Sequence, residues 1–346
     1  MNVSVIIPFH SPAEGGEDAA ALLERLCRSV SAQTLVDFEA ILASDGATGP
    51  VLDSAKRIAA GDSRFRLLEL PKRGVSAARN AALDSAGGDW IAFADADDSA
   101  DPGWLESMFA RAVETGADYV TAPFWICEEG KAPRVAELRA NYDFSSNSAI
   151  MEGYLPRIFG HSFDDVRAWY RGASLFAGRE LGGLWRGLWR RETLENAQVR
   201  FVEGLSLYED SVFIAEGLLA AKRMAATALP CYRYFPRKSG SMARRWRGED
   251  FAMNRLKLLE ARAAVDAKSG GRLYPFYAAS CVFAPLEMAF AALKGQVPLK
   301  NALACLKTAL RREDVRRALR DFPLSPRKPL LAATVLLFRC RRKPRT

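Results

Sequence analysis

Three carboxylates follow one another closely at the end of an apolar run. Residues 90–94 are apolar throughout and predict a strand buried on both faces. Asp95, Asp97 and Asp98 come directly after it, with Ala96 between the first two. In a parallel sheet, ligands bind at the carboxyl ends of the strands, and clustered carboxylates repel one another unless a cation lies among them. Hard oxygen ligands suit Mg²⁺ or Mn²⁺, so we expect a divalent-metal site here.

The alternative is that these acids only begin the next helix. Asp101-Pro-Gly103 has the features of a helix start, where a carboxylate is favourable. One aspartate is sufficient for that purpose, whereas three follow the apolar run. The sequence therefore favours the metal site.

Strand-like and helix-like segments alternate through the first part of the chain, which predicts a doubly wound α/β sheet. The loop after the first expected strand, residues 3–8, lacks the Gly-x-Gly-x-x-Gly pattern of dinucleotide-binding folds. Further strands are expected at 38–43, 65–70, 90–94, 119–124 and 231–235, and helices at 17–33, 75–86, 104–115 and 211–221. Beyond residue 250 the sequence predicts helices only.

The net charge of +8 is distributed unevenly. Residues 300–346 contain 14 Lys/Arg against 3 Asp/Glu, whereas residues 1–299 contain 35 against 38. All the excess positive charge therefore belongs to the C-terminal tail, and no interleaved aromatic stacking pattern accompanies it. We expect no nucleic-acid partner.

The six cysteines show neither zinc-binding spacing nor a redox pair, so we expect reduced thiols. No uninterrupted apolar run reaches the ~18 residues of a membrane span. The apolar start has no basic residues ahead of it, unlike a signal peptide. These features predict a cytoplasmic protein.

Five motifs occur in a specific order. They are Val3-Ser-Val-Ile-Ile-Pro8, Ser44-Asp-Gly46, Gly74-Val-Ser-Ala-Ala-Arg-Asn80, Phe93-Ala-Asp-Ala-Asp-Asp98 and Tyr208-Glu-Asp210. A closing pattern, Tyr232-Arg-Tyr-Phe-Pro followed by Ser239-Gly-Ser241, comes after them. With this order the chain resembles the family 2 glycosyltransferases, enzymes with a GT-A fold that use nucleotide-sugar donors.

The resemblance implies a domain organisation. Residues 1–245 are expected to form the GT-A domain, with a nucleotide-sugar-binding half at 1–127 and an acceptor-binding half at 128–245. A helical, basic C-terminal region is expected at 246–346.

The resemblance also implies which residues bind the nucleotide. Pro8 and Phe9 are expected to contact the base through their backbone, with His10 beside them in place of the tyrosine of many relatives. Asp45 matches the acid that reads uracil, so a UDP-sugar is the expected donor. Arg79 matches an arginine that approaches the nucleotide and its phosphates.

The acid cluster matches the D-x-D motif of the family. Asp95 is expected near the ribose and the metal, and Ala96 beside it in the donor site. Asp97 is expected to hold Mn²⁺ or Mg²⁺, and Asp98 to border the sugar. The metal would neutralise the leaving diphosphate.

Asp210 matches the catalytic base of the family, and Glu209 lies beside it. A single base opposite the leaving group would give direct displacement with inversion at the anomeric carbon. A hydrolase would instead use two carboxylates, one of them protonated, without a metal.

Two departures from the family bear on the acceptor. Trp185-Arg186-Gly187 stands where many bacterial relatives have Trp-Asn-Lys, and Arg244-Arg245-Trp246 lacks the glutamine of the processive synthases. We therefore expect transfer of a single sugar. The resemblance implies a glycan or lipid-linked glycan acceptor in cell-surface polysaccharide synthesis. The alternatives are a sugar-phosphate nucleotidylyltransferase, whose Gly-rich loop is missing, and a non-catalytic binding module, which would be expected to have lost Asp97 or Asp210.

The C-terminal tail has the composition of a membrane-surface segment. Residues 329–338 are apolar except for Thr334, and basic residues flank them on both sides. Ten residues are too short to span a bilayer but can lie in its interface. We expect this tail to hold the protein peripherally at an anionic inner membrane face, with a helix packed on the catalytic domain as the alternative.

Overall fold

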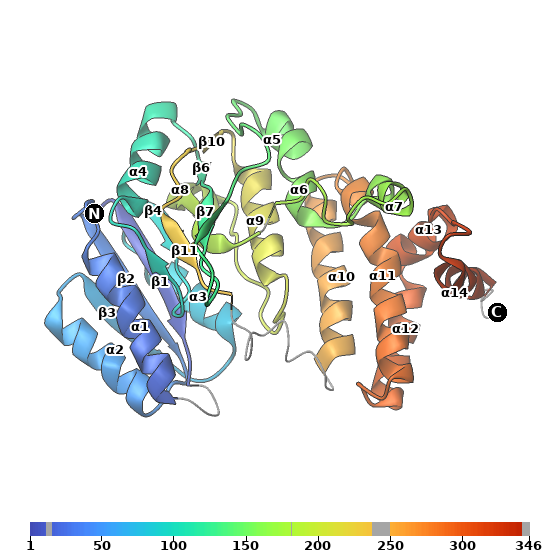
Figure 1. Ribbon diagram of the computed structural model, residues 1–346, viewed down its shortest axis with the longest axis horizontal. Coiled ribbons are helices and arrows are strands. Elements are labelled where there is room, and N and C mark those ends of the chain that lie inside the picture. The colour runs from blue at the N-terminus through green and yellow to red at the C-terminus, as the bar shows by residue number, and fades with distance from the viewer. Residues whose placement is uncertain (12–15, 181, 237–249, 341–346) are drawn as a thin grey trace. The chain divides into compact units, whose positions relative to one another are not determined.

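The computed structural model describes residues 1–11, 16–180, 182–236 and 250–340 (Figure 1). The chain divides into two compact units. The first, here called the sheet unit, consists of Met1–Tyr154 and Leu181–Lys238. The second, here called the helical unit, consists of Leu155–Glu180 and Ser239–Thr346.

The sheet unit is built on seven strands in the order β10-β6-β9-β4-β1-β2-β3. All neighbours are parallel except β9, which runs antiparallel between β4 and β6. The strands are β1 (Val3–Phe9), β2 (Phe38–Asp45), β3 (Phe65–Leu70), β4 (Trp90–Phe93), β6 (Tyr119–Thr121), β9 (Gly187–Arg190) and β10 (Met224–Ala226). The predicted α/β class with a largely parallel sheet is confirmed.

Helices cover both faces of this sheet because its central strands are apolar on both sides. Val3, Val5 and Ile7 of β1 pack in one core with α1 (Gly16–Ser31), α2 (Pro50–Gly61) and α4 (Trp104–Thr115). On the other face, Phe93 of β4 makes edge-to-face contacts with Phe201 and with Phe213 of α9 (Glu209–Ala220). The helix α3 (Val75–Ser85) packs against β1 and β2.

A second sheet of four short strands lies in the same unit, in the order β5-β11-β7-β8. Its strands are β5 (Ser99–Ala100), β7 (Phe124–Ile126), β8 (Arg134–Ala136) and β11 (Tyr232–Tyr234). The predicted strand at 119–124 is therefore two strands, β6 and β7, in different sheets. Because β5 follows the acid cluster and pairs with β11, this sheet fixes the position of the loop that carries the acids.

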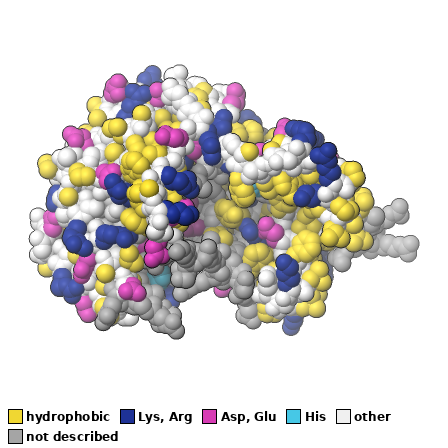
Figure 2. All heavy atoms as spheres, viewed as in Figure 1, with side chains coloured by type: hydrophobic (Ala, Val, Ile, Leu, Met, Phe, Trp, Pro, Cys, Tyr) yellow, Lys and Arg dark blue, Asp and Glu magenta, His cyan; other side chains and the backbone are white. Residues whose placement is uncertain are grey.

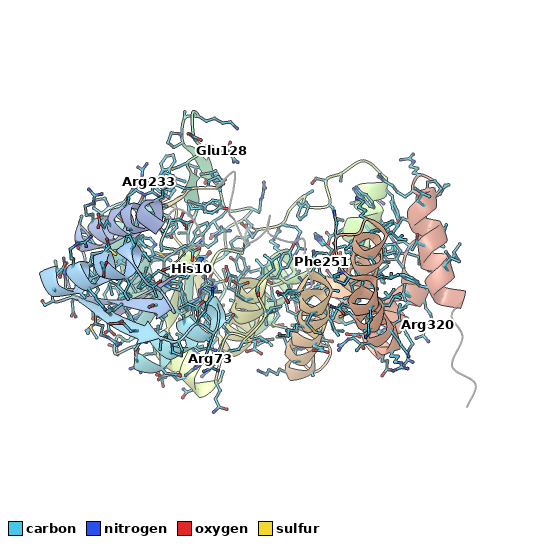
Figure 3. The ribbon with its side chains drawn as sticks, turned by 90° about the horizontal axis from the view of Figure 1, so that it is seen from below. His10, Arg73, Glu128, Arg233, Phe251 and Arg320 are labelled. Atoms are coloured by element: carbon cyan, nitrogen blue, oxygen red, sulfur yellow. The ribbon has the colours of Figure 1, made fainter. Side chains whose placement is uncertain are left out.

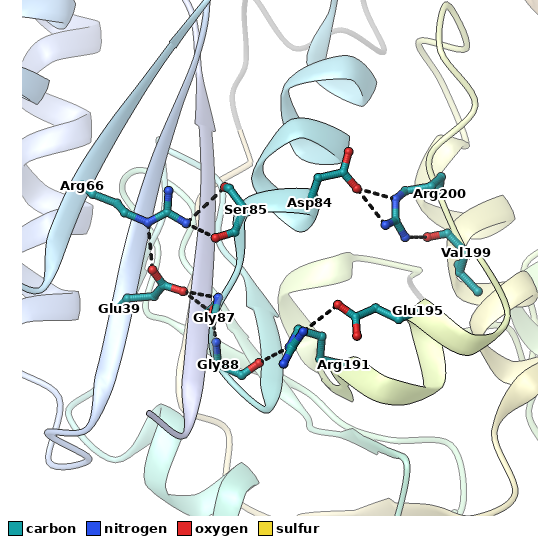
Figure 4. A network of polar contacts seen from close by, with 11 residues as sticks. Glu39, Arg66, Asp84, Ser85, Gly87, Gly88, Arg191, Glu195, Val199 and Arg200 are labelled. Carbon is teal, nitrogen blue, oxygen red and sulfur yellow. Dashed lines mark hydrogen bonds and ion pairs between the residues drawn. The ribbon is translucent and has the colours of Figure 1, made fainter.

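A polar network ties β1, β2 and β4 together at their amino ends (Figure 4). The Glu39 carboxylate accepts hydrogen bonds from Ser4 Oγ (2.6 Å), the Gly87 amide (2.7 Å) and Arg66 Nε (2.8 Å). Arg191 Nε donates to the Gly88 carbonyl (2.6 Å). Burial alone would raise the pKa of Glu39, but the hydrogen bonds from Ser4, Arg66 and Gly87 lower it overall.

The Glu39 network should contribute measurably to stability. Glu39→Gln is expected to lower the free energy of unfolding by about 1–3 kcal/mol, because the hydrogen bonds from Ser4, Arg66 and the Gly87 amide lose the charge of their acceptor. The lowered pKa means that this contribution is present above the unfolded-state pKa and is lost as the pH falls through the folded-state pKa. Urea unfolding of wild type and variant at several pH values measures it.

Glu69→Gln is the matched control, because Glu69 pairs with Lys56 at an exposed position on the neighbouring strand. It is expected to change the unfolding free energy by less than about 0.5 kcal/mol. Equal effects of the two substitutions would show that the network does not stabilise the sheet.

The helical unit confirms the predicted helical C-terminal region. It contains α6 (Pro156–Phe159), α7 (Phe163–Tyr170), α10 (Asp250–Lys268), α11 (Tyr274–Leu293), α12 (Leu299–Arg311), α13 (Glu313–Asp321) and α14 (Pro329–Cys340). The remaining elements, α5 (Asn147–Gly153), the 3₁₀ helix η1 (Leu184–Arg186) and α8 (Arg191–Asn196), belong to the sheet unit.

The division of the chain differs from the boundary at residue 245 because Leu155–Glu180 belongs to the helical unit. Phe159 packs edge-to-face on Tyr277 of α11 at 5.4 Å, and Tyr170 Oη donates to the Pro323 carbonyl at 3.0 Å. These contacts join residues far apart in sequence, so pattern reading along the chain does not detect them. The assignment of residues 128–245 to acceptor binding stays a prediction.

One helix of the described residues, α11, is long and apolar enough to cross a membrane by length and composition. No membrane-spanning segment was expected from the sequence, because no uninterrupted apolar run reaches the required length. Glu287 interrupts the apolar sequence of α11. In the structure, 61% of its apolar window is buried inside the protein. The helix forms the centre of the helical unit, where it packs against α10, α12 and α13.

Candidate active site

The carboxyl ends of β1, β2 and β4 meet at one edge of the large sheet. Phe9, the last residue of β1, is in register with Ser44, one residue before the end of β2. Ile6 is in register with Phe93, so β4 ends earlier and the acid cluster follows beside the last residues of β1. The parallel register therefore brings the three predicted strand-end segments together.

The residues after β1 differ in their exposure. Pro8 and Phe9 are buried, whereas the next residue, His10, is exposed. His10 is labelled in Figure 3. The predicted backbone contacts of Pro8 and Phe9 with the base stay a prediction. Ser11 Oγ accepts from the Thr48 amide and donates to its carbonyl, both at 2.7 Å, and so ties this loop to the one after β2.

Asp45 holds the loop that precedes α3. One of its carboxylate oxygens accepts hydrogen bonds from the amides of Arg73 (2.7 Å) and Gly74 (2.8 Å). The next residue, Gly46, has a φ of +64°, and a Cβ there would lie 2.6 Å from the Lys72 side chain. The loops after β2 and β3 are thereby packed closely, and the base-reading role of Asp45 stays a prediction.

Asp98 is held inside the protein. Its side-chain oxygens accept from Tyr232 Oη (3.0 Å) and the Phe235 amide (2.9 Å), and Asp98 is only 1% exposed. Burial and the nearby Asp95 and Asp97 raise the pKa of Asp98 well above its usual value. These bonds fix the position of Asp98 in the loop, and its expected place at the border of the sugar site stays a prediction.

Tyr232 is a site residue whose role the sequence did not indicate. Its hydroxyl donates to Asp98 and also accepts from the Asp95 amide at 3.0 Å, so it binds the acid-cluster loop at two points. The ring of Trp185 stacks on Tyr232 with centroids 4.9 Å apart. Tyr232 begins the closing pattern Tyr232-Arg-Tyr-Phe-Pro, but the sequence does not show that it contacts the loop of the acid cluster. The pairing of β11 with β5 brings the two together.

A second contact to the loop comes from α1. A guanidinium nitrogen of Arg25 donates to the Asp97 carbonyl, and the guanidinium lies 4.1 Å from the centre of the Phe235 ring. The backbone of the acid cluster is therefore fixed from α1 on one side and from β11 on the other.

Asp95 and Asp97, with Ala96 between them, are half-buried, whereas Asp98 is buried. No group of three His, Cys, Asp or Glu side chains arranged to hold a metal occurs within the described parts of the chain. Two carboxylates fit Mg²⁺ or Mn²⁺, because such ions commonly use one or two protein carboxylates together with substrate phosphates.

Arg79 joins the acid cluster to the predicted base. One of its terminal nitrogens lies 3.1 Å from Asp95, and the other lies 3.1 Å from both Glu209 and Asp210. Burial opposes the charge of Arg79, but the three carboxylates more than offset this and raise its pKa. The guanidinium is thus bound by carboxylates within the protein, and its expected approach to the nucleotide and its phosphates stays a prediction.

Glu209 and Asp210 begin α9, where a negative charge is favourable. The residue before them, Tyr208, has a φ of 63°, which is unusual for a bulky side chain and is typical of strained functional sites. The side chain of Glu209 is 8% exposed, whereas that of Asp210 is 26% exposed. Asp210 is therefore the more accessible acid of the pair.

The surroundings of Asp210 favour proton uptake. Burial and the neighbouring carboxylates of Glu209 and Asp95 raise the pKa of Asp210 well above its usual value, although Arg79 opposes this shift. A carboxylate with a raised pKa is a stronger base, and general bases work best with a pKa near the operating pH. The site therefore presents a basic carboxylate beside a pair of acids suited to a metal.

Arg186 is the middle residue of Trp185-Arg186-Gly187, which stands where many relatives have Trp-Asn-Lys. It is 1% exposed, its Nε donates to the Ala122 carbonyl at 3.2 Å, and its guanidinium lies over the Phe124 ring. The arginine is part of the packing between β7 and η1, so it does not replace the missing family lysine at the surface of the site.

Comparisons with known proteins agree with this geometry. The sequence model of Glycosyl transferase family 2 matches residues 4–166. The chain is 27% identical over 234 residues to the uncharacterized glycosyltransferase YibD of Escherichia coli strain K12, covering 67% of this chain and 61% of YibD. It is 30% identical over 226 residues to the succinoglycan biosynthesis protein ExoO of Rhizobium meliloti, covering 62% and 60% of the two chains. The matches thus span about three fifths of these relatives.

Solved structures share the fold. S. aureus TarS 1–349 in complex with UDP-GlcNAc aligns with a TM-score of 0.63 at 18% identity, over 98% of this chain and 88% of that one. The mannosyltransferase PcManGT from Pyrobaculum calidifontis, in complex with GDP-Man and Mn²⁺, aligns with a TM-score of 0.50 at 16% identity, over 97% and 80%. At these identities the likeness concerns the fold, and it confirms the predicted GT-A architecture.

Proposed function

Because the chain belongs to the family 2 glycosyltransferases and has a GT-A fold, we propose that it transfers one sugar from a nucleoside-diphosphate sugar to an acceptor hydroxyl with inversion. The observation that carries this proposal is the contact of Arg79 with acids from two sides of the site. The donor-side acid Asp95 and the base-side pair Glu209 and Asp210 each lie 3.1 Å from its guanidinium.

The donor is proposed to bind along the carboxyl ends of β1, β2 and β4. The backbone of Pro8 and Phe9 and the carboxylate of Asp45 would hold the base, and His10 is exposed beside them. Asp95 and Asp97 would hold Mn²⁺ or Mg²⁺, which would neutralise the charge on the leaving diphosphate. A UDP-sugar fits best, because a carboxylate accepts a hydrogen bond from the uracil N–H, and the related fold of TarS binds UDP-GlcNAc.

Asp210 is proposed to take the proton from the acceptor hydroxyl. Its pKa is raised, its side chain is partly exposed, and Arg79 and the start of α9 fix its orientation. Glu209 is more buried and shares the same guanidinium nitrogen. Glu209 would therefore position Arg79 and contribute to the raised pKa of Asp210.

Nucleotide binding tests the donor site before any acceptor is known. Titration calorimetry with UDP and GDP, each with and without Mn²⁺, is expected to show binding of UDP that strengthens at least about tenfold with the metal, since Asp95 and Asp97 would hold a cation that offsets the charge of the diphosphate. Absence of binding by both nucleotides in the presence of Mn²⁺ would contradict the proposed donor site.

The acceptor is proposed to be a glycan or a lipid-linked glycan in cell-surface polysaccharide synthesis. ExoO, to which the chain is similar, is named for succinoglycan biosynthesis. Transfer of one sugar, without processive synthesis, agrees with the missing glutamine before Arg244. Arg244-Arg245-Trp246 lies outside the described residues.

The C-terminal tail is proposed to bind an anionic membrane face, but the described basic residues that flank or end α14 contact the protein itself. Arg327 donates to the Tyr170 carbonyl, Lys328 lies over the Trp169 ring, and Arg339 donates to the Leu319 and Phe322 carbonyls. The helix α14 nevertheless exposes leucines, namely Leu330, Leu336 and Leu337. The remaining basic residues, Arg341, Arg342, Lys343 and Arg345, lie outside the described residues.

Those last four basic residues provide the sharper test of the tail. Replacing all four with glutamine is expected to weaken binding to anionic vesicles by about 10²–10³-fold at low salt, because each Lys/Arg near such a surface contributes about 1 kcal/mol. Vesicle flotation measures the loss, and nucleotide binding should be unchanged. Unaltered flotation would remove these residues from membrane binding.

A further inference from the structure

The helices α11 and α12 form an antiparallel hairpin whose connected end is apolar and basic. Near this end Phe290 and Leu293 of α11 are 43% and 81% exposed, and Leu299 and Leu303 of α12 are 59% and 50% exposed. Single exposed apolar side chains are common on soluble proteins, whereas four large ones within fourteen residues form a surface that needs an explanation. We call these four residues and the basic residues beside them the hairpin surface.

The exposed leucines of α12 lie in addition to a buried apolar face of the same helix. In α12, Ala302, Cys305, Leu306 and Ala309 are buried, so the helix already has a complete apolar face against its own unit. Leu299 and Leu303 lie one turn apart on the remaining surface, where polar residues are the rule.

The charge of this segment has one sign. Residues 288–312 contain five Lys/Arg and no Asp/Glu. Lys294, Lys300, Lys307 and Arg311 are exposed, and none of the four forms an ion pair with another described residue. The basic residues around α14, by contrast, are bound to carbonyls and a ring of the protein. Figure 2 shows hydrophobic and basic side chains close together at the end of the helical unit where α11 and α12 are joined.

We propose that the hairpin surface docks on an anionic lipid membrane, with its leucines and phenylalanine in the headgroup–acyl boundary and its lysines among the anionic headgroups. The exposed apolar side chains match the acyl boundary of such a membrane, and the positive charges beside them match its anionic headgroups. A protein partner is favoured less, because an apolar interface core between proteins is depleted of lysine. The docking does not depend on the transferase activity.

Vesicle flotation of the full chain tests the docking with two variants. Lys294→Gln/Lys300→Gln/Lys307→Gln is expected to weaken binding to vesicles of phosphatidylcholine with about one third phosphatidylglycerol by about 100-fold at low salt, since each basic residue contributes roughly fivefold. Leu293→Gln/Leu299→Gln/Leu303→Gln is expected to weaken binding at low and at high salt, by about tenfold or more per leucine. Pure phosphatidylcholine vesicles should bind weakly in all cases.

A matched control separates this surface from the total charge. Lys56→Gln/Lys131→Gln/Lys222→Gln removes the same charge from exposed positions of the sheet unit and is expected to leave vesicle binding within about twofold. An equal loss in this control, or no binding by the unaltered chain at low salt, would overturn the proposal. So would unchanged flotation of the leucine variant together with conversion of an oligomer to a monomer in analytical ultracentrifugation, which would assign the surface to a protein interface.

The readouts separate this inference from the proposed enzyme activity. UDP binding is expected to be the same in all three variants. A chain that floats with vesicles but binds no nucleotide would contradict the proposed function and leave the docking in place. If the leucine variant does not fold, as judged by circular dichroism, the lysine variant and its control decide the question.

Discussion

Asp97→Asn is expected to lower the rate of sugar transfer by about 10³-fold or more. Metal stabilisation of a leaving diphosphate amounts to several kcal/mol, and each ~1.36 kcal/mol corresponds to a tenfold change in rate. The substituted asparagine would retain the size of the side chain but lose the negative charge that holds a divalent cation. Initial rates with Mn²⁺ in excess measure the loss, and excess chelator should abolish wild-type activity in the same assay.

The fold should survive this substitution. Asp97 is half-buried and its carbonyl, which the substitution keeps, accepts the contact from Arg25. The melting temperature is therefore expected to change little, in contrast to Asp98→Asn, which weakens the buried contacts with Tyr232 and the Phe235 amide. Asp53→Asn, an exposed acid of α2, is the control for the substitution itself. Full turnover by wild type in excess chelator would contradict the metal assignment.

Asp210→Asn is expected to reduce kcat by about 10²–10⁴-fold, the usual contribution of a general base. The asparagine keeps the size of the side chain and can still contact other groups, but it cannot accept the proton of the acceptor. UDP binding should change by less than about threefold, because Asp210 is proposed to act on the acceptor side. Rates at saturating donor and the calorimetric affinity for UDP provide the two measurements, and an unchanged kcat would remove Asp210 from the mechanism.

The pH dependence provides a second readout of the same base. A base works only when deprotonated, so activity should fall as the pH drops through the raised pKa of Asp210. Glu209→Gln removes a like charge that raises this pKa, so the acidic limb of the profile should move to lower pH. A shift to higher pH would show that Glu209 does not act through this charge.

The strand-end positions of the site could be predicted from the sequence because they depend on local pattern. Residues 90–94 are apolar throughout and residues 3–8 are apolar except for Ser4, and the structure buries both segments in the central strands β1 and β4. Polar residues directly after such strands must collect at one edge of a parallel sheet. Asp45 and the acid cluster are expected to lie together for this reason.

The contacts between distant segments could not be predicted. The strand β9 enters the centre of the sheet antiparallel to β4 and β6, from a stretch of four residues that has no distinctive period. Arg79 of α3 contacts both Asp95 and Asp210, and these contacts depend on how α3 and α9 pack on the large sheet. Asp97 and Asp98 are adjacent in sequence, and the bonds that hold Asp98 inside the protein come from Tyr232 and the Phe235 amide, more than 130 residues away.

Hydrolysis of a panel of UDP- and GDP-sugars, in the presence of Mn²⁺ and without acceptor, tests the account most directly. The wild-type chain is expected to release UDP from at least one UDP-sugar, and Asp97→Asn to release it at least about 10³-fold more slowly. This result would establish the donor class and the role of the acid cluster together. Binding of no nucleotide and hydrolysis of no donor by a folded wild-type chain would contradict the account.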